Sequence, residues 1–189
     1  WMKKNGGSVW LSGEDSKHIR VYDTKGSIQH LVPIPRGTIV CSMLEHDFIW
    51  IGTQNEIILI DPKTLERIAS WEPHDSFVVS LAQASANMIW SACSNGEIGL
   101  WEVCGMQISC IQKRVEQIGQ HIVSLHTRGE NEIVCTADCH LLLWDTQAIK
   151  PLQELEFEKG LESIDTGTLD DGRVVVVHNN GMISSYKLE

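Results

Sequence analysis

The sequence predicts an all-β protein, a β-propeller of four-stranded antiparallel blades. Three observations predict this fold class. A pattern of strands repeats about every 40 residues, each period contains four short β-rich runs, and no run shows helical periodicity. We interpret residues 1–189 as a single propeller segment that contains about four to five blades.

The repeat is defined by two independent sets of anchor positions. The first anchors, residues 10, 50, 90, 133 and 175, are spaced by 40, 40, 43 and 42 residues. The last anchors, residues 22, 60, 101, 144 and 186, are spaced by 38, 41, 43 and 42 residues. Chance clustering of apolar residues would not keep one period twice, so we predict hairpins of successive blades at 9–23, 48–61, 88–102, 132–145 and 174–187.

Two further runs accompany each hairpin. A preceding inner strand carries a Ser in Val40-Cys41-Ser42-Met43, Val79-Ser80-Leu81 and Val123-Ser124-Leu125, and more loosely in Glu162-Ser163-Ile164. An outer strand is predicted at 28–34, 67–71, 107–111 and 152–157. Asn95-Gly96 and Asn180-Gly181 supply the positive φ that tight turns need. By this pattern the first hairpin lacks an inner strand and the last lacks an outer one.

Composition narrows the class of protein. The chain is 42% hydrophobic and 21% charged, with a formal net charge of −10, so a phosphate backbone would be repelled and we expect no nucleic-acid partner. No apolar run is long enough to predict a transmembrane segment. Of the six cysteines, Cys41, Cys93 and Cys135 lie in apolar strand-like runs. We therefore predict reduced thiols and a cytoplasmic protein.

Several motifs resemble the WD40 repeat family. Trp144-Asp145 is the Trp-Asp pair that ends a strand in that family, and Trp101-Glu102 and Tyr22-Asp23 are similar to it. Pro73-His74, shortly before a Val-rich strand, resembles the His that opens a WD40 blade. The resemblance covers essentially the whole chain and implies a larger ring of seven blades, with a five-bladed closure as the alternative.

The resemblance also implies a buried network of His, turn Asp, strand hydroxyl and Trp. The residues that match it are structural predictions: His74, Trp101, Thr136, Asp138 and Trp144. In the third repeat Asn95 and Cys93 stand where the family has the acid and the hydroxyl. In the fourth, His121 lies three places late. No repeat carries the full set.

Residue types that carry chemistry are sparse. Cys135, Cys139 and His140 have a spacing that suits a turn better than a zinc site, and the Asp-Gly of Asp170-Asp171-Gly172 is explained by a tight turn. Glu154, Glu156 and Glu158 alternate with apolar residues, as in an outer strand with one solvent-exposed face. Motifs for hydrolysis, phosphate binding and zinc catalysis are missing. We therefore predict no enzyme, cofactor or metal.

The tryptophans are predicted to pack. Trp10, Trp50 and Trp90 occupy equivalent strand positions, so we interpret them as packing between blades. Asp61, Thr64 and Trp71 follow one another in an order that resembles the Asp…Thr…Trp pattern of quinoprotein-type propellers. That family is the alternative, ranked below WD40.

The resemblance implies a partner-binding face made by two sets of loops at one end of the channel. The first set contains Arg36, Phe77, His121 and Lys159, and the second contains Lys17, His18, Gln54, Asn95, His140 and Asn179. Loops on a rigid scaffold commonly carry binding, and interface energy concentrates in aromatic and Arg anchors. Arg36 and Phe77 are therefore the sharper predictions.

The leading hypothesis is a protein- or peptide-binding scaffold within a larger intracellular signalling or trafficking protein. The Val-Trp-Leu-Ser-Gly and Ile-Trp-Ile-Gly-Thr strands resemble the divergent propellers of large kinases and guanine-nucleotide exchange factors. One alternative is a homo-oligomer that associates through rim or edge strands, since unpaired strands are templates for pairing. The other is a quinoprotein-like or enzymatic propeller.

Overall fold

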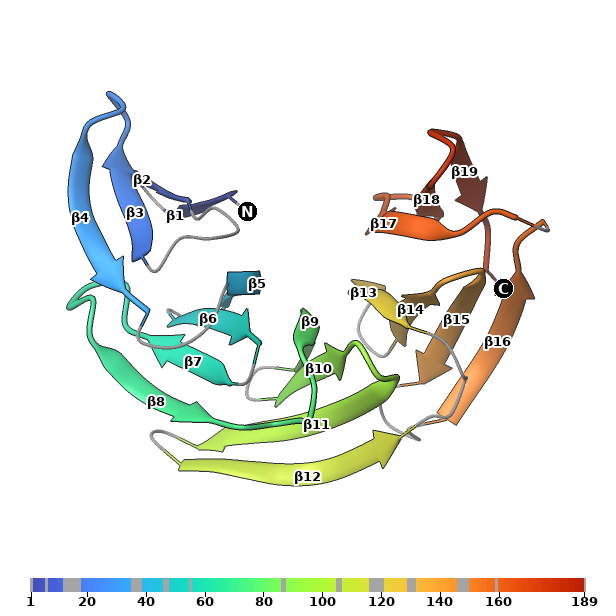
Figure 1. Ribbon diagram of the computed structural model, residues 1–189, viewed down its shortest axis with the longest axis horizontal. Helices are drawn as coiled ribbons and strands as arrows, with labels where there is room; N and C mark the ends of the chain where they lie inside the picture. Colours follow the sequence, from blue (N-terminus) through green and yellow to red (C-terminus); the bar gives the residue numbers. More distant parts are fainter. Residues whose placement is uncertain are drawn as a thin grey trace. The chain divides into compact units, whose positions relative to one another are not determined.

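The computed structural model describes residues 2–5, 7–11, 18–34, 39–45, 48–54, 56–85, 88–104, 107–115, 121–128, 132–145, 150–158 and 160–188. Side chains are described in these ranges except at 2–5, 39–45, 84–85, 103–104 and 107–115. The all-β prediction is confirmed: the described residues form five small antiparallel sheets and contain no helix (Figure 1). Accordingly, no membrane-spanning helix occurs among them.

The five sheets follow the chain in order. The first contains β1 (Met2–Asn5), β2 (Ser8–Leu11), β3 (His18–Asp23) and β4 (Ile28–Pro33), and the second contains β5 (Ile39–Glu45), β6 (Phe48–Thr53), β7 (Ile57–Ile60) and β8 (Arg67–Trp71). The third contains β9 (Val78–Ser85), β10 (Met88–Cys93), β11 (Glu97–Cys104) and β12 (Gln107–Val115). The fourth contains β13 (Ile122–Arg128), β14 (Glu132–Ala137), β15 (His140–Asp145) and β16 (Lys150–Glu156). The fifth contains β17 (Ser163–Thr168), β18 (Val174–His178) and β19 (Ile183–Tyr186).

Each sheet is a meander in which every strand pairs with its neighbour in the chain. Short turns make this order possible, and Gly96 and Gly181 in the predicted Asn-Gly turns have φ values of 89° and 83°. Asp138 also has a positive φ, 37°, and serves the β14–β15 turn.

One sequence prediction about the strands is wrong. The first sheet has an inner strand, because β1 pairs with β2 from Met2 opposite Leu11 to Asn5 opposite Ser8. The sequence concealed β1 because Met2-Lys3-Lys4-Asn5 lacks the apolar Val-Ser pattern of the other inner strands. Backbone pairing does not need that pattern. The fifth sheet has three strands among the described residues, and β19 ends it.

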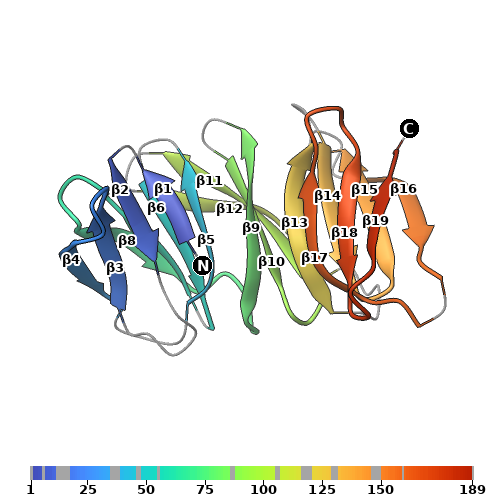
Figure 2. The ribbon, with the colours of Figure 1, turned by 90° about the horizontal axis from the view of Figure 1, so that it is seen from above.

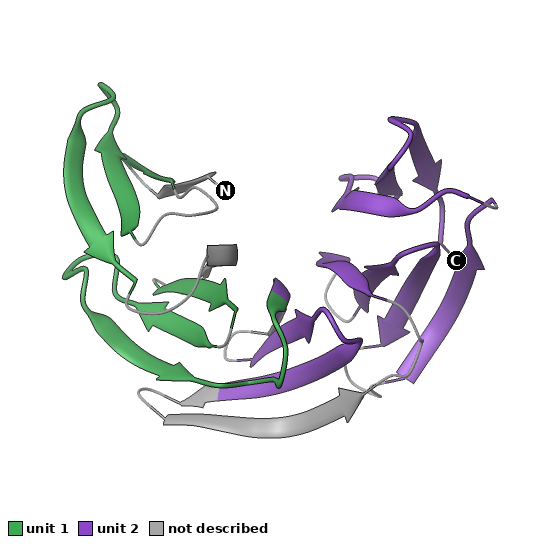
Figure 3. Ribbon diagram, viewed as in Figure 1, with its two compact units in different colours: residues 1–78 green, residues 79–189 purple. Residues whose placement is uncertain are grey.

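The chain divides into two compact units, residues 1–78 and 79–189 (Figure 3). The first unit contains the first two sheets, which share one apolar cluster that includes Trp10, Ile19, Ile51 and Ile58. Trp50, also buried in this unit, meets Trp71 edge-on with ring centroids 5.9 Å apart.

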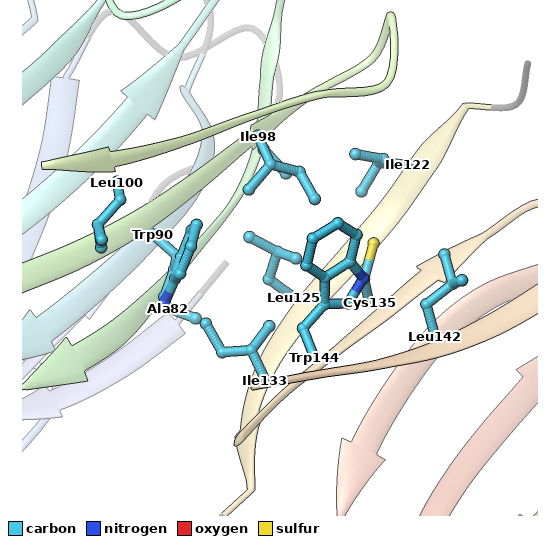
Figure 4. Close-up of a cluster of buried hydrophobic side chains, with 11 residues drawn as sticks. Ala82, Trp90, Ile98, Leu100, Ile122, Leu125, Ile133, Cys135, Leu142 and Trp144 are labelled. Atoms are coloured by element: carbon cyan, nitrogen blue, oxygen red, sulfur yellow. The ribbon is translucent and has the colours of Figure 1, made fainter. Parts of the chain in front are cut away.

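The second unit contains the last three sheets and has two apolar clusters. Trp90 and Leu100 of the third sheet pack with Ile133 and Trp144 of the fourth (Figure 4). On its other face, the fourth sheet contributes Val134, Leu141 and Leu143 to a cluster with Val174 and Val176 of the fifth. Burying one such side chain contributes about 1.5–3 kcal/mol, so these two clusters hold the three sheets together.

Candidate functional site

One edge of the second unit gathers four of the predicted partner-binding and structural residues, Asn95, His121, Asp138 and Asn179. This turn edge comprises the β10–β11 turn at 94–96, His121 before β13, the β14–β15 turn at 138–139, the described part of the β16–β17 connection at 157–158 and 160–162, and the β18–β19 turn at 179–181. Figure 2 shows the strands that lead to it running side by side. The meander order places these turns at equivalent strand ends.

Hydrogen bonds tie the turns of three successive sheets together. His121 Nδ1 lies 2.6 Å from the carbonyl oxygen of Ser94, so Nδ1 carries the proton and donates it. Asp138 accepts the backbone NH of His121 at 3.1 Å through Oδ2 and donates its own backbone NH to the His121 carbonyl at 3.2 Å. The backbone NH of Ser163 donates to the Asp138 carbonyl at 2.6 Å.

The remaining turns of the edge are held in the same way. The backbone NH of Asn179 donates to the Glu162 carbonyl at 3.0 Å, and its side-chain amide reaches the Glu162 carboxylate at 3.4 Å. Asn95 Oδ1 accepts the backbone NH of Glu97 at 3.2 Å, which shapes the β10–β11 turn. These hydrogen bonds fix the shape of the edge, so little conformational entropy would be lost from its turns when a partner binds.

The edge combines carboxylates with imidazoles. Glu158 and Glu162 are exposed, Asp138 is half-buried, and His121 is exposed on the same edge. Carboxylates at these positions favour a partner that presents basic groups or hydrogen-bond donors.

The predicted structural residue Trp101 has a buried acceptor that the sequence analysis missed. Its indole NH donates to Ser91 Oγ at 2.7 Å. The indole NH therefore bonds to Ser91, two residues before Cys93, the residue at the position that matches the hydroxyl in the WD40 pattern. A Cβ on Gly99 would lie 2.8 Å from the Trp101 ring, so this strand position admits only glycine. A lone glycine in an apolar strand was the signal for this close approach.

The other structural residues do not form one network. Thr136 Oγ1 lies 2.7 Å from Ser124 Oγ and 2.9 Å from Thr166 Oγ1, giving a buried chain of hydroxyls across β13, β14 and β17. Asp138 bonds to His121 instead. Among the described residues, the buried indole NH of Trp144 has no hydrogen-bond partner.

Of the other predicted partner-binding residues, His140 opens β15 in the second unit, and the first unit contains three whose placement is described. Phe77 precedes β9 and is 49% exposed, His18 opens β3 on the surface, and Gln54 lies in the β6–β7 turn. His74 is buried between β8 and β9. Lys17, Arg36 and Lys159, the last in the second unit, lie outside the described residues.

The first unit contains a pocket of about 460 Å³ that no sequence pattern indicated. Trp10 and Val21 line it with Asp23, His30 and Lys63. Asp23 is engaged in its own turn, where it accepts the backbone NH groups of residues 25 and 27 at 2.8 and 2.9 Å. These bonds, that of Ser27 foremost, lower the pKa of the Asp23 carboxyl.

Cys135 and Cys139 face opposite sides of the fourth sheet. Cys135 belongs to the cluster with Trp144, whereas Cys139 packs against the cluster with Leu141. The two sulfurs therefore do not share a ligand set, in keeping with the turn interpretation.

No family model and no curated protein matches this chain.

Proposed function

We propose that the chain is a WD40-like propeller segment that binds a protein or peptide on its turn edge. In this proposal it is a non-catalytic scaffold within a larger intracellular signalling or trafficking protein. Five sheets with one strand order, repeating about every 40 residues, support the propeller. The WD40 assignment depends on the sequence motifs.

One observation carries the docking role: the hydrogen-bonded path Ser94–His121–Asp138–Ser163 locks the turns of three sheets into one edge. Loops held in place by a scaffold are pre-organised, so a partner loses little entropy to loop ordering on binding. Exposed Glu158 and Glu162 would give the edge its specificity for a basic or donor-rich segment.

The fifth sheet supports a ring with further blades. β18 reads Val174 to Val177, apolar at every position, as strands buried on both faces do. Of these four valines, Val174 and Val176 are fully buried and Val175 and Val177 are half-buried. In the proposed ring, another blade covers Val175 and Val177.

A quantitative pull-down from cell extract tests the docking role. The bait is compared with a Glu158→Lys, Glu162→Lys double variant, which reverses two exposed charges of the turn edge. Asp170→Lys is the matched control, because Asp170 is an exposed carboxylate in the β17–β18 turn at the other end of β18. We expect specific partners to be lost from the double variant and retained by the control. If all three baits retained the same partners equally, the binding site would lie elsewhere on the chain.

Self-association is the second candidate function, and the exposed side chains of the fifth sheet favour it. Ile164 and Ile183 are 58% and 67% exposed, and β19 has an open edge among the described strands. Light scattering across a concentration series decides this: an oligomer that Ile183→Asp dissociates supports it, and a monomer at high concentration removes it.

A further inference from the structure

Three side chains beside the turn edge form a thiol–imidazole–carboxylate series. Cys139 Sγ lies 3.2 Å from His140 Nδ1, and His140 Nε2 lies 3.8 Å from Glu154 Oε1. Pairing of β15 with β16 sets this geometry, since His140 is opposite Glu156 and Leu142 is opposite Glu154. Glu154 therefore lies diagonally across from His140 on the same face.

The carboxylate lies beside the imidazole nitrogen that is farther from the thiol. In the tautomer protonated at Nε2, the imidazole NH faces Glu154 and the Nδ1 lone pair is directed at the thiol. When Nδ1 takes up the thiol proton, the imidazolium that forms faces this carboxylate. This is the arrangement of nucleophile, base and orienting group that activates cysteine.

Exposure distinguishes Cys139 from the other cysteines whose side chains are described. Cys93 and Cys135 are fully buried, whereas Cys139 is half-buried in a surface turn. Burial raises the pKa of the Cys135 thiol to about 12, so Cys135 stays protonated and inert at neutral pH. The fourth sheet thus carries a shielded thiol and an accessible one only four residues apart.

We propose that Cys139 is a modification site that undergoes thiol–disulfide exchange with low-molecular-weight disulfides, with His140 as its base. In this step the thiol proton passes from Sγ to His140 Nδ1. The thiolate attacks one sulfur of the disulfide, the S–S bond breaks, and a new bond joins Sγ to that sulfur. The leaving thiolate recovers the proton, so Cys139 is oxidised to a mixed disulfide while one thiol is released.

The test incubates the folded chain with oxidised glutathione and follows adduct formation by mass spectrometry, with fragmentation to separate Cys139 from Cys135. We expect an adduct on Cys139 and none on Cys135. His140→Ala should slow the reaction by at least about tenfold, as loss of a general base does. Added free imidazole should restore part of the rate, which a purely structural role would not allow.

Two further variants keep the outcome decisive. Cys139→Ser should abolish the adduct, and Glu154→Gln, which keeps the shape of the side chain, should slow its formation a few-fold. An adduct on Cys135 in any variant shows that this variant has unfolded. If His140→Ala unfolds, the rate of adduct formation on Cys139 in Glu154→Gln decides whether the series activates the thiol. The proposal would be overturned if Cys139 did not react in the folded chain, or if the wild type, His140→Ala and Glu154→Gln formed the adduct at equal rates.

Discussion

The fourth and fifth sheets have similar hairpins but different surroundings. In the fourth sheet, successive side chains of β14 point to opposite faces. Ile133 and Cys135 belong to one apolar cluster and Val134 belongs to the other, so both faces of the sheet are covered. In the fifth, β18 buries Val174 and Val176 in one cluster, while its other face lies beside exposed Ile183.

This difference shows what a strand sequence specifies and what its neighbours decide. Both β14 and β18 are nearly continuous apolar runs, the pattern of a strand with two buried faces. Among the described residues of the second unit, the fourth sheet packs against one sheet on each side, and the fifth packs against the fourth alone. Stability should therefore be distributed unevenly, and the variants below test that distribution.

The largest expected effect on the global free energy of unfolding comes from a cavity in the doubly covered sheet. Leu143 of β15 is fully buried, so Leu143→Ala should lower the free energy of unfolding by about 2–5 kcal/mol. Ile183→Ala in β19, 67% exposed, should change it by less than about 0.5 kcal/mol. Urea unfolding followed by tryptophan fluorescence measures both. Equal losses would mean that Ile183 is covered in solution.

Arg128 should determine how firmly the fifth sheet is held. From the end of β13, its guanidinium donates to the carbonyl oxygens of Gly172, in the β17–β18 turn, and Leu188, just after β19, both at 2.9 Å. Both carbonyls lie at the same end of the fifth sheet, because Val174 pairs with Tyr186. Arg128→Ala removes these charge-assisted bonds, each contributing about 1.5–3 kcal/mol.

Hydrogen exchange reports this loss locally. Amides of β18 should exchange faster in Arg128→Ala, while those of β14 should keep their protection. Glu132→Gln is the control, because it removes only the 2.8 Å ion pair of Arg128 with Glu132 and leaves both carbonyl contacts. Faster exchange throughout the unit would show that the two sheets open together.

Replacing Thr136 should lower the free energy of unfolding by a smaller amount, and the loss should be shared by the fourth and fifth sheets. Thr136→Val keeps the shape of the side chain but removes the hydroxyl that joins Ser124 to Thr166. Two buried hydroxyls then lose a partner, at a cost of about 1–3 kcal/mol. The exposed Thr168→Val is the matched control, expected to be nearly neutral in urea unfolding. A neutral Thr136→Val would mean that water replaces the lost bonds.

The sequence predicted what depends on local pattern. Period and alternation predict the all-β class, and Asn-Gly pairs predict the positive φ at Gly96 and Gly181. Turn residues such as His121 were predicted for the candidate edge, but their bond partners were not. Ser94 reaches His121 across 27 residues through its backbone carbonyl, which is present at every residue and leaves no sequence signal.

Two other features depended on distances that sequence spacing does not encode. The acceptor for Trp101 is Ser91, one of several hydroxyls within reach in the sequence, and only strand register selects it. The Cys139–His140–Glu154 series likewise depends on the diagonal pairing of β15 with β16. The hairpin that carries it could be inferred, whereas its register could not.

The smallest expected effect concerns the β17–β18 turn of the fifth sheet. Asp171 accepts the Arg173 backbone NH at 3.1 Å and Nε at 2.7 Å, and these bonds, the backbone one foremost, lower the pKa of its carboxyl below 3.8. A carboxyl whose pKa is lowered by folding stabilises the folded state above its unfolded pKa and loses that contribution as pH falls through its folded pKa. The stability gap between wild type and Asp171→Asn should therefore be present at neutral pH and shrink below pH 3.8.

Thermal unfolding at a series of pH values measures that gap. Because the turn is exposed and its sheet is covered on one face only, the shift in midpoint should be far smaller than that of Leu143→Ala. Asp170→Asn in the same turn is the control, since neither of these bonds to Arg173 involves its carboxyl. A gap for Asp171→Asn that is unchanged in acid would show that the turn acts through its backbone alone. The charge of Asp171 would then contribute nothing to the stability of the fifth sheet.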